Sequence, residues 1–463
     1  MTAGQNTWKG QAVDTSGAGG SDAGKNYIVQ ALIEKGMSKE YRRYSALGQL
    51  AKPVKGRMIG DKQMRDQDVA ASAVVASKTI TKGDECRFSL VRNITGATTF
   101  GDTPIADGDF LSYLHANLRL NKTATPAFQL TEEMSKMRAM DLVAGEESEL
   151  RQQITLFLSE EYTYEAYRGL LKGRSLNLAA DYKDGGLALD MGRGAGKAVS
   201  PSRVIVVGDG EVTPPTSSLP ADLDTYEAAI ETALNAQLVA IAANPLNGTI
   251  EKELVTDIRN YIIDQKIKGV MVGGKQKWFV PCDPAIIRAL TKDDGDLYEA
   301  WKISLHHDKT MDTSEIYQGV GHIELEDLVF FKDPYLSQFR PSIDPTGQAG
   351  DGAVIMNADG TVKLGCDELR NPRAYTPLAT DVFAPMLVLG EQALLEANTG
   401  KVETMKEEGK FKQGASIAST IKQAFMRTRF LPKDGSTEKE LNQSMALFYV
   451  NAPNAFTSFS KTY

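Results

Sequence analysis

The longest helical pattern in the sequence covers residues 131–172. Its later apolar residues recur every three or four positions, as on one face of a helix, at Leu150, Ile154, Phe157, Tyr164, Tyr167 and Leu171. Thr131 is suited to cap the beginning of this helix, and Gly173 is suited to end it. Gly145 leaves a kink and two consecutive helices as open alternatives. The pattern predicts a rod that buries the Phe157 side, with Glu160 and Glu161 facing water or a seam between subunits.

Two alternating patterns before this helix predict a pair of half-buried strands. The first alternates at Cys86, Phe88 and Leu90, and the second runs from Leu114 to Leu120. The residues between them, 93–112, contain three glycines and one proline and are too many for a tight hairpin turn. We therefore expect two strands that carry a projecting loop.

Shorter patterns predict the remaining elements. Short helices are expected over Tyr27–Gly36 and Leu297–Ile303, and longer helices over Leu223–Ala243 and Thr249–Ile267. Strands are expected over Val204–Val207, Trp278–Val280, His322–Lys332 and Met445–Val450. Asp283 and Pro284 predict the start of a helix over Ala285–Thr291, because these residue types favour the cap and the first turn. Residues 333–380 contain five prolines and are predicted to be mainly loop, whereas Val382–Ala397 carries mixed strand and helix signals.

Composition indicates a globular chain with a substantial core. Apolar residues make up 42% of the 463 positions, and the length suggests two or three structural units. The three cysteines, Cys86, Cys282 and Cys366, are too widely separated to predict a disulfide or zinc framework. No apolar run is long enough to cross a bilayer, and the first residues lack the hydrophobic stretch of a secretory signal. No membrane partner is therefore expected.

Charge is distributed unevenly along the chain. Residues 1–82 carry 13 Lys and Arg against 7 Asp and Glu, a balance of +6, so the remainder carries −8 − 6 = −14. A basic segment on an acidic body suggests an arm that meets nucleic acid or a neighbouring copy of the chain. Its central basic residues are Arg42, Arg43, Lys52, Lys55 and Arg57. We favour the neighbouring copy because apolar residues interleave with these charges, although composition alone slightly favours a solvated terminal segment.

Two glycine-rich motifs suggest phosphate or nucleotide binding, but neither fits the pattern that such binding requires. Residues 269–275 read GVMVGGK, which matches the core of a phosphate-binding loop, but Gln276 stands where Ser or Thr would hold magnesium. A helix is predicted before these glycines and a strand after them, the reverse of the required order, so a helix-to-strand turn is the better interpretation. The MGRGAGK segment at 191–197 fits neither phosphate-loop nor dinucleotide spacing. We assign no catalytic, cofactor-binding or metal-binding residue, and no cofactor.

Several segments between residues 101 and 450 carry a resemblance through their order and spacing. They are GDTPIADGDFLSYLHANLRLNK, EEMSKMRAMDLVAGEESELRQQ, LSEEYTYEAYRGL, WFVPCDPAIIRAL, LYEAWK, EIYQGVGHIELEDLVFF, VFAPMLVLGEQALLEANTG, IKQAFMRTRF and SMALFYVNAP. In this order they resemble the major capsid proteins of tailed double-stranded DNA phages. Residues 1–100 match nothing in that pattern, and residues 185–220 and 333–380 resemble insertions into it.

The resemblance implies an α+β fold, the HK97-like capsid fold shared with herpesviruses. It implies five parts: an N-terminal arm (1–82), an extended loop with flanking strands (83–130), a spine helix (131–175), an apical domain (176–320), and remaining peripheral and apical segments (321–463).

It also implies a structural role in the virion, as a major capsid protein that assembles in the host cytoplasm into an icosahedral shell. The implied partners are copies of the chain in hexamers and pentamers, packaged double-stranded DNA bound without sequence specificity, and possible scaffold, decoration and portal proteins. An encapsulin-like compartment shell and a nucleotide-binding enzyme that uses Lys275 are the alternatives.

Overall fold

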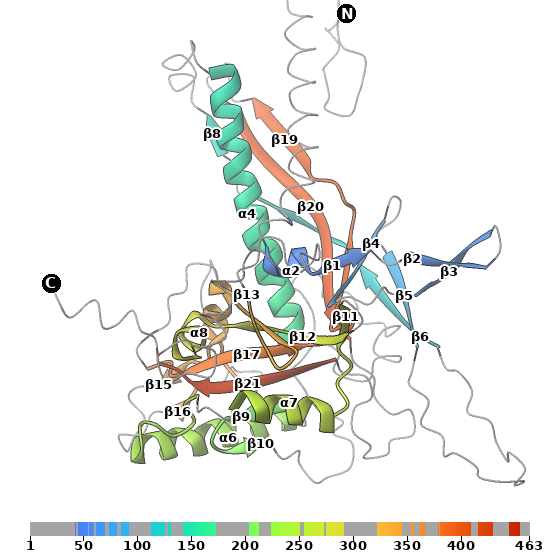
Figure 1. The fold of residues 1–463 in the computed structure, drawn as a ribbon. Coiled ribbons are helices and arrows are strands. Elements are labelled where there is room, and N and C mark those ends of the chain that lie inside the picture. The colour runs from blue at the N-terminus through green and yellow to red at the C-terminus, as the bar shows by residue number, and fades with distance from the viewer. Residues whose placement is uncertain are drawn as a thin grey trace, which may run out of the picture.

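Two β-sheets and one long helix between them make up the centre of the protein (Figure 1). The computed structural model describes residues 42, 45–53, 55–59, 62–69, 74–80, 85–91, 113–125, 128–130, 142–172, 203–212, 224–250, 254–272, 275–290, 322–344, 353–355, 362–365, 378, 380–408, 415–428 and 444–453. Both sheets are mainly antiparallel and helices pack against them, so the predicted α+β class is confirmed. The expected helices at 27–36 and 297–303, the loop at 93–112 and the caps Thr131 and Gly173 lie outside the described residues.

The long helix α4 (Leu142–Lys172) continues through Gly145, so a break into two helices at that residue is wrong. Residues 162–167 are buried on every side of the helix, because this part lies between the two sheets and the core is continuous around it. The sequence predicted a single apolar stripe instead. Phe157 is half-buried rather than buried, since the earlier part of α4 lies along one sheet only (Figure 1).

The first sheet lies along α4 and is built around one long strand, β20 (Ala415–Arg427) (Figure 1). The strand order is β1-β4-β18-β20-β19, and β7 and β8 also pair with β20. These strands are β1 (Ala51–Pro53), β4 (Val75–Thr79), β18 (Leu394–Asn398), β19 (Glu403–Glu408), β7 (Asn121–Ala124) and β8 (Phe128–Leu130). Gly169 of α4 allows close contact with this sheet, because an added Cβ there would lie 3.0 Å from the Phe425 Cβ.

Two hairpins project sideways from the first sheet (Figure 1). Strands β5 (Glu85–Val91) and β6 (Tyr113–Arg119) pair antiparallel, with Leu90 opposite Leu114. This confirms the predicted strand pair. The second hairpin joins β2 (Lys55–Ile59) and β3 (Lys62–Val69).

The second sheet has eight strands drawn from distant parts of the chain. Its order is β10-β9-β21-β17-β12-β14-β13, and β11 pairs with the outer part of β12. The strands are β9 (Val204–Val206), β10 (Gly210–Glu211), β11 (Val270–Val272), β12 (Lys275–Cys282), β13 (His322–Leu325), β14 (Leu328–Lys332), β17 (Phe383–Leu389) and β21 (Met445–Asn451). Val382–Ala397, whose signals were mixed, is therefore mainly two strands, β17 and β18.

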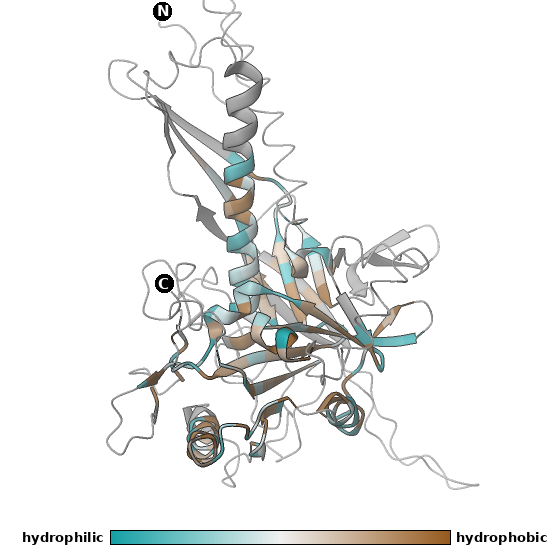
Figure 2. Ribbon diagram, turned by 60° about the vertical axis from the view of Figure 1, so that its left-hand side comes forward, coloured by the Kyte–Doolittle hydropathy of each residue, from teal (hydrophilic) through white to brown (hydrophobic). Residues whose placement is uncertain are grey.

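Alternate residues of the second sheet pack on opposite faces, as β-strand geometry requires. Val280 packs with α7 (Leu254–Asp264) and α8 (Pro284–Leu290). Phe279 packs in the core that contains α4 and α6 (Asp224–Ala243). Figure 2 shows the central strands of this sheet mainly in hydrophobic colours, as expected when both faces are covered.

Three short elements lie within residues 333–380, which were predicted to be mainly loop. They are the 3-10 helix η2 (Pro334–Phe339) and the paired strands β15 (Ile343–Asp344) and β16 (Ala353–Val354). Near the beginning of the chain, the short helix α2 (Ala46–Gln49) precedes β1 and packs beside α4.

Candidate functional site

The glycine-rich motif at 269–275 forms part of a hairpin. Strands β11 and β12 pair antiparallel, with Val270 opposite Lys277 and Val272 opposite Lys275. The predicted helix-to-strand turn is therefore wrong, because a strand already begins at Val270. Lys275 starts β12, and the next helix in the chain, α8, begins only at Pro284. The helix that would direct its N-terminus at a phosphate does not follow these glycines.

Packing accounts for one glycine of this motif. A Cβ at Gly269 would lie 3.0 Å from Trp278 Cε2 and 3.1 Å from the Lys277 carbonyl oxygen. The Trp278 indole nitrogen in turn donates a hydrogen bond of 3.0 Å to the Ile267 carbonyl oxygen. Glycine at position 269 therefore lets the chain before β11 approach β12 closely. Its presence is not evidence for nucleotide binding.

No group of three or more metal-binding side chains occurs in the described ranges. His322 begins β13, as the sequence predicted. His306 and His307 lie outside the described residues. The arrangement of these histidines gives no reason to assign a metal site.

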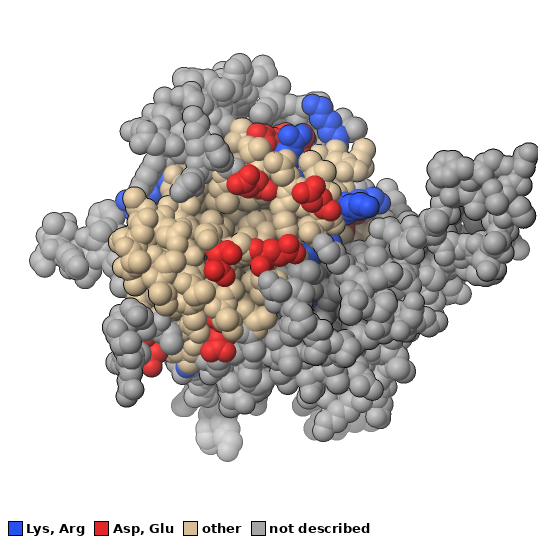
Figure 3. Space-filling model, turned by 90° about the horizontal axis from the view of Figure 1, so that it is seen from below, with Lys and Arg blue, Asp and Glu red and all other residues tan. Residues whose placement is uncertain are grey.

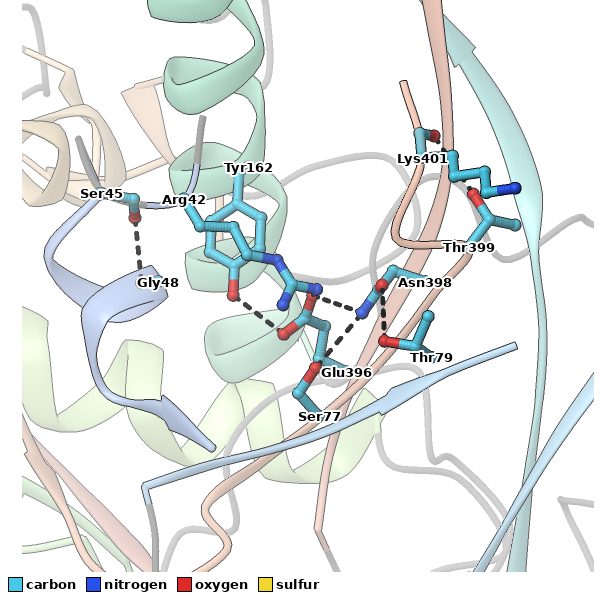
Figure 4. Close-up of polar contacts among 10 residues, drawn as sticks. All are labelled: Arg42, Ser45, Gly48, Ser77, Thr79, Tyr162, Glu396, Asn398, Thr399 and Lys401. Atoms are coloured by element: carbon cyan, nitrogen blue, oxygen red, sulfur yellow. Dashed lines mark hydrogen bonds and ion pairs between the residues drawn. The ribbon is translucent and has the colours of Figure 1, made fainter. Parts of the chain in front are cut away.

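The side chains of three chain segments meet at Glu396, which is fully buried on β18 (Figure 4). Arg42 donates a charged hydrogen bond to Glu396 Oε1, and the Tyr162 hydroxyl donates one of 3.1 Å to Oε2. Asn398 Nδ2 donates to Oε1 at 2.9 Å and to Ser77 Oγ at 3.2 Å. These contacts connect the beginning of the described chain, α4 and the first sheet.

A fully buried ion pair lies at the ends of three central strands of the second sheet. Arg340 donates to both carboxylate oxygens of Asp283, from Nε at 3.0 Å and from Nη2 at 2.9 Å. Its Nη1 donates to the carbonyl oxygens of Asp381 and Ala452, at 2.7 and 2.8 Å. Asp283 also accepts from the Ala285 N–H at 2.8 Å, which confirms its predicted place as the cap of α8. Arg340 thus holds together the ends of β12, β17 and β21.

A buried carboxyl joins α4 to the second sheet. The Tyr167 hydroxyl donates a hydrogen bond of 2.7 Å to Asp333 Oδ2, and the Tyr335 N–H donates one of 3.0 Å to Oδ1. Burial raises the pKa of Asp333 from its ordinary value of 3.8 to about 6, although both hydrogen bonds oppose the shift. Burial also raises the pKa of the Tyr167 hydroxyl and that of the neighbouring Cys282 thiol. The protonation of this junction is therefore expected to change near pH 6.

Helices α6 and α7, which lie at the lower face of the molecule (Figure 1), expose apolar groups to solvent. Val239 on α6 and Leu246 just after it are 58% and 72% exposed, and Ile263 on α7 is 53% exposed. Residues 232–246 contain no charged side chain. Seen from below, the described part of this face is mostly uncharged, with acidic groups over its middle (Figure 3). An uncharged, partly apolar surface suits contact with protein, and acidic groups disfavour contact with DNA.

No pattern in the sequence indicated that the charged residues Glu396 and Arg340 are buried. Glu396 alternates between apolar neighbours and so has the pattern of a solvent-facing strand position. Arg42 was expected to face DNA or a neighbouring copy, but its guanidinium contacts Glu396 of its own chain. The partners are 354 residues apart in sequence, so no local pattern could have indicated the pair.

Comparison with solved structures finds similarity to phage capsids. The capsid of Ralstonia phage GP4 is 13% identical, with 86% of this chain and 94% of that chain covered and a TM-score of 0.48. The capsid of cyanophage Pam1 is 12% identical, with 86% and 95% covered and a TM-score of 0.46. The head of Helicobacter pylori bacteriophage KHP40 is 11% identical, with 86% and 94% covered and a TM-score of 0.46. These are structures of the class that the sequence resembles.

No protein-family model matches the chain, and no curated protein matches it. None of the helices in the described part of the chain combines the length and hydrophobicity needed to span a membrane.

Proposed function

We propose that this chain is a structural major capsid protein that assembles with copies of itself into the head shell of a tailed double-stranded DNA phage. The observation that carries the proposal is the arrangement of its parts. A long helix lies along one sheet and is continuous in its core with a second sheet, and a β-hairpin projects to the side (Figure 1). The sequence resemblance implies these same parts: a spine helix, an extended loop and an apical domain.

Physical features of the subunit support a role in assembly. The second sheet is covered on both faces, and Arg340 holds together the ends of its central strands, so we expect it to be rigid. The apolar residues of the lower face remain exposed in the single chain. Interfaces between obligate partners commonly bury roughly 2,000 Å² or more, and such exposed groups would contribute to them. The subunit acts through repeated surface contacts under symmetry and not as an enzyme.

The division of the chain follows from the same proposal. Residues 1–82 form the arm, 83–130 the extended loop with strands β5 to β8, and 131–175 the spine with α4. Residues 176–320 form most of the apical domain, and residues 321–463 return to both parts. Strands β17 and β21, from residues 321–463, pair in the second sheet with strands from residues 176–320, so the last segment also contributes to the apical domain.

Partners follow from the charge distribution and the resemblance. Copies of the chain would form hexamers and pentamers, and packaged DNA would meet the inner surface without sequence specificity. The acidic groups over the middle of the lower face disfavour contact with DNA there, and the apolar residues interleaved with the basic residues of the arm favour a neighbouring copy as its partner. Scaffold, decoration and portal proteins are further partners of such a shell.

Sedimentation velocity of the purified full chain tests the proposal. We expect particles far larger than the 50.4 kDa subunit, with or without added scaffold or DNA. A chain that stays monomeric at high concentration under all of these conditions would contradict it.

Variants of the lower face refine this test. Val239→Glu places a charge at an exposed apolar position of α6 and is expected to reduce assembly without unfolding the subunit. Gln153→Glu makes the same charge change at an exposed polar position of α4, outside the lower face, and is the matched control. If the two variants assemble equally well, the α6 surface is not part of the contacts between subunits.

A further inference from the structure

Glu396 is the least accessible charged group in the polar cluster that Figure 4 shows. Its side chain is 0% exposed, whereas that of Arg42 is 27% exposed. The two groups would therefore respond differently to separation. Arg42 could be hydrated with little movement, but Glu396 would be left as a buried carboxylate without its cation, which is costly.

Arg42 begins a segment that is firmly packed on the rest of the chain. Ser45 caps α2 by accepting from the Gly48 N–H at 3.3 Å, and it also accepts a hydrogen bond of 2.8 Å from Thr163 of α4. Leu47 and Leu50 lie in the main core, and β1 continues the segment as a parallel partner of β4. We name residues 42–53 the docking segment.

The chain turns tightly at the start of the docking segment. The Ser45 N–H donates a hydrogen bond of 3.2 Å to the Arg42 carbonyl oxygen. A Cβ at Gly48 would lie only 2.4 Å from that same oxygen. The glycine therefore lets the backbone fold back so that the Arg42 side chain reaches β18.

We propose that Arg42 and Glu396 form a charge lock that couples the position of the docking segment to α4 and β18. With Arg42 in place, the carboxylate is neutralised and the Tyr162 hydroxyl of α4 completes its hydrogen bonds. Withdrawal of the docking segment removes the cation that neutralises this carboxylate. The lock thus favours the docked state and makes release of the docking segment depend on a rearrangement around α4. This inference concerns the fold of the single chain and does not depend on the proposed function.

Cleavage by thermolysin measures release of the docking segment, because the enzyme cuts before leucine and both Leu47 and Leu50 are buried in the docked state. Arg42→Met keeps an unbranched apolar stem and removes the charge. In the unassembled full chain, we expect this variant to be cut before these residues roughly 10- to 100-fold faster, the range for loss of a charged hydrogen bond.

The charge mechanism is tested by repeating the substitution in a Glu396→Gln background. The amide can place its oxygen at the Oε1 position, where it accepts from Asn398 Nδ2, and its NH2 group can donate to the Tyr162 hydroxyl oxygen. Because it carries no charge, Arg42→Met should change the cleavage rate of E396Q little. Lys401→Met is the matched control, since Lys401 is exposed and its ammonium points away from Glu396 (Figure 4). It should be cut at the rate of the unmodified chain.

Two results would overturn the lock. One is an equal acceleration by Arg42→Met in both backgrounds, which would show that the side chain acts by packing alone. The other is a rate for Arg42→Met equal to that of Lys401→Met. Should Arg42→Met fail to fold, recovery of soluble protein by adding Glu396→Gln supports the lock, and insolubility of both variants contradicts it.

Discussion

The buried Asp333 makes a specific prediction about pH. Its carboxyl accepts hydrogen bonds from the Tyr167 hydroxyl and the Tyr335 N–H, yet burial raises its pKa from 3.8 to about 6. Below its unfolded pKa the group is protonated in both states and has no effect on the free energy of unfolding. Above pH ~6 it is ionised in both states, and the folded state bears the cost of the buried charge. The free energy of unfolding is therefore higher at pH ~4, and it falls as the pH rises from about 4 to about 6.

The magnitude follows from the size of the shift. About two pKa units at about 1.4 kcal/mol each correspond to about 3 kcal/mol. Asp333→Asn removes the ionisation and leaves an amide whose oxygen can accept from the Tyr335 N–H and whose NH2 group can donate to the Tyr167 hydroxyl oxygen, so that this second hydrogen bond reverses its direction. We expect the unfolding free energy of the variant to equal that of the unmodified chain near pH 4, and to exceed it by about 3 kcal/mol near pH 7.5.

Urea unfolding of the unassembled chain, with the two proteins measured side by side from pH 4 to pH 8, gives this difference directly. Comparison of the pair cancels the pH dependence of all other carboxyl groups. Gln153→Ala, at an exposed position of α4, is the control: it changes no ionisable group, so its difference from the unmodified chain should not change with pH. A difference between Asp333→Asn and the unmodified chain that is constant with pH would refute the reasoning, because it would mean that folding does not shift the pKa.

Three further predictions concern packing, charge pairing and assembly. Leu158→Ala, in the buried part of α4, should lower the unfolding free energy by about 2–5 kcal/mol, whereas Gln153→Ala at an exposed position should change it by less than about 0.5 kcal/mol. Arg340→Met should cost about 3–5 kcal/mol in urea unfolding, because it leaves Asp283 unpaired, and adding Asp283→Asn should recover part of the loss. Deletion of residues 96–111 should leave a folded subunit by circular dichroism that no longer forms closed shells by electron microscopy, and normal shells would exclude this loop from assembly.

Local patterns in the sequence were sufficient for elements whose signals are short-range. The cap at Asp283 placed α8 within one residue of its observed start, and alternation placed β5 and β6. Helix α6 was predicted within one residue at its beginning and correctly at its end, because its alanine-rich sequence favours a helix. These are cases in which neighbouring residues alone determine the backbone.

Long-range packing explains what the sequence did not reveal. Strand β20 pairs with β18, β19, β7 and β8, and a strand with so many partners loses the simple alternation of a half-exposed strand. Enclosure of α4 between two sheets buries polar residues such as Thr163 and Glu165, which a one-sided helix would expose. Glu396 and Arg340 became recognisable as structural charges only when their distant partners were placed beside them.

Cryo-electron microscopy of particles formed by the full chain tests the central claim most directly. We expect closed icosahedral shells in which each subunit contains α4 lying along β20 and joined to the second sheet through the Tyr167–Asp333 contact. Uniform monomers or small open oligomers, at high concentration and with scaffold and DNA supplied, would contradict the account.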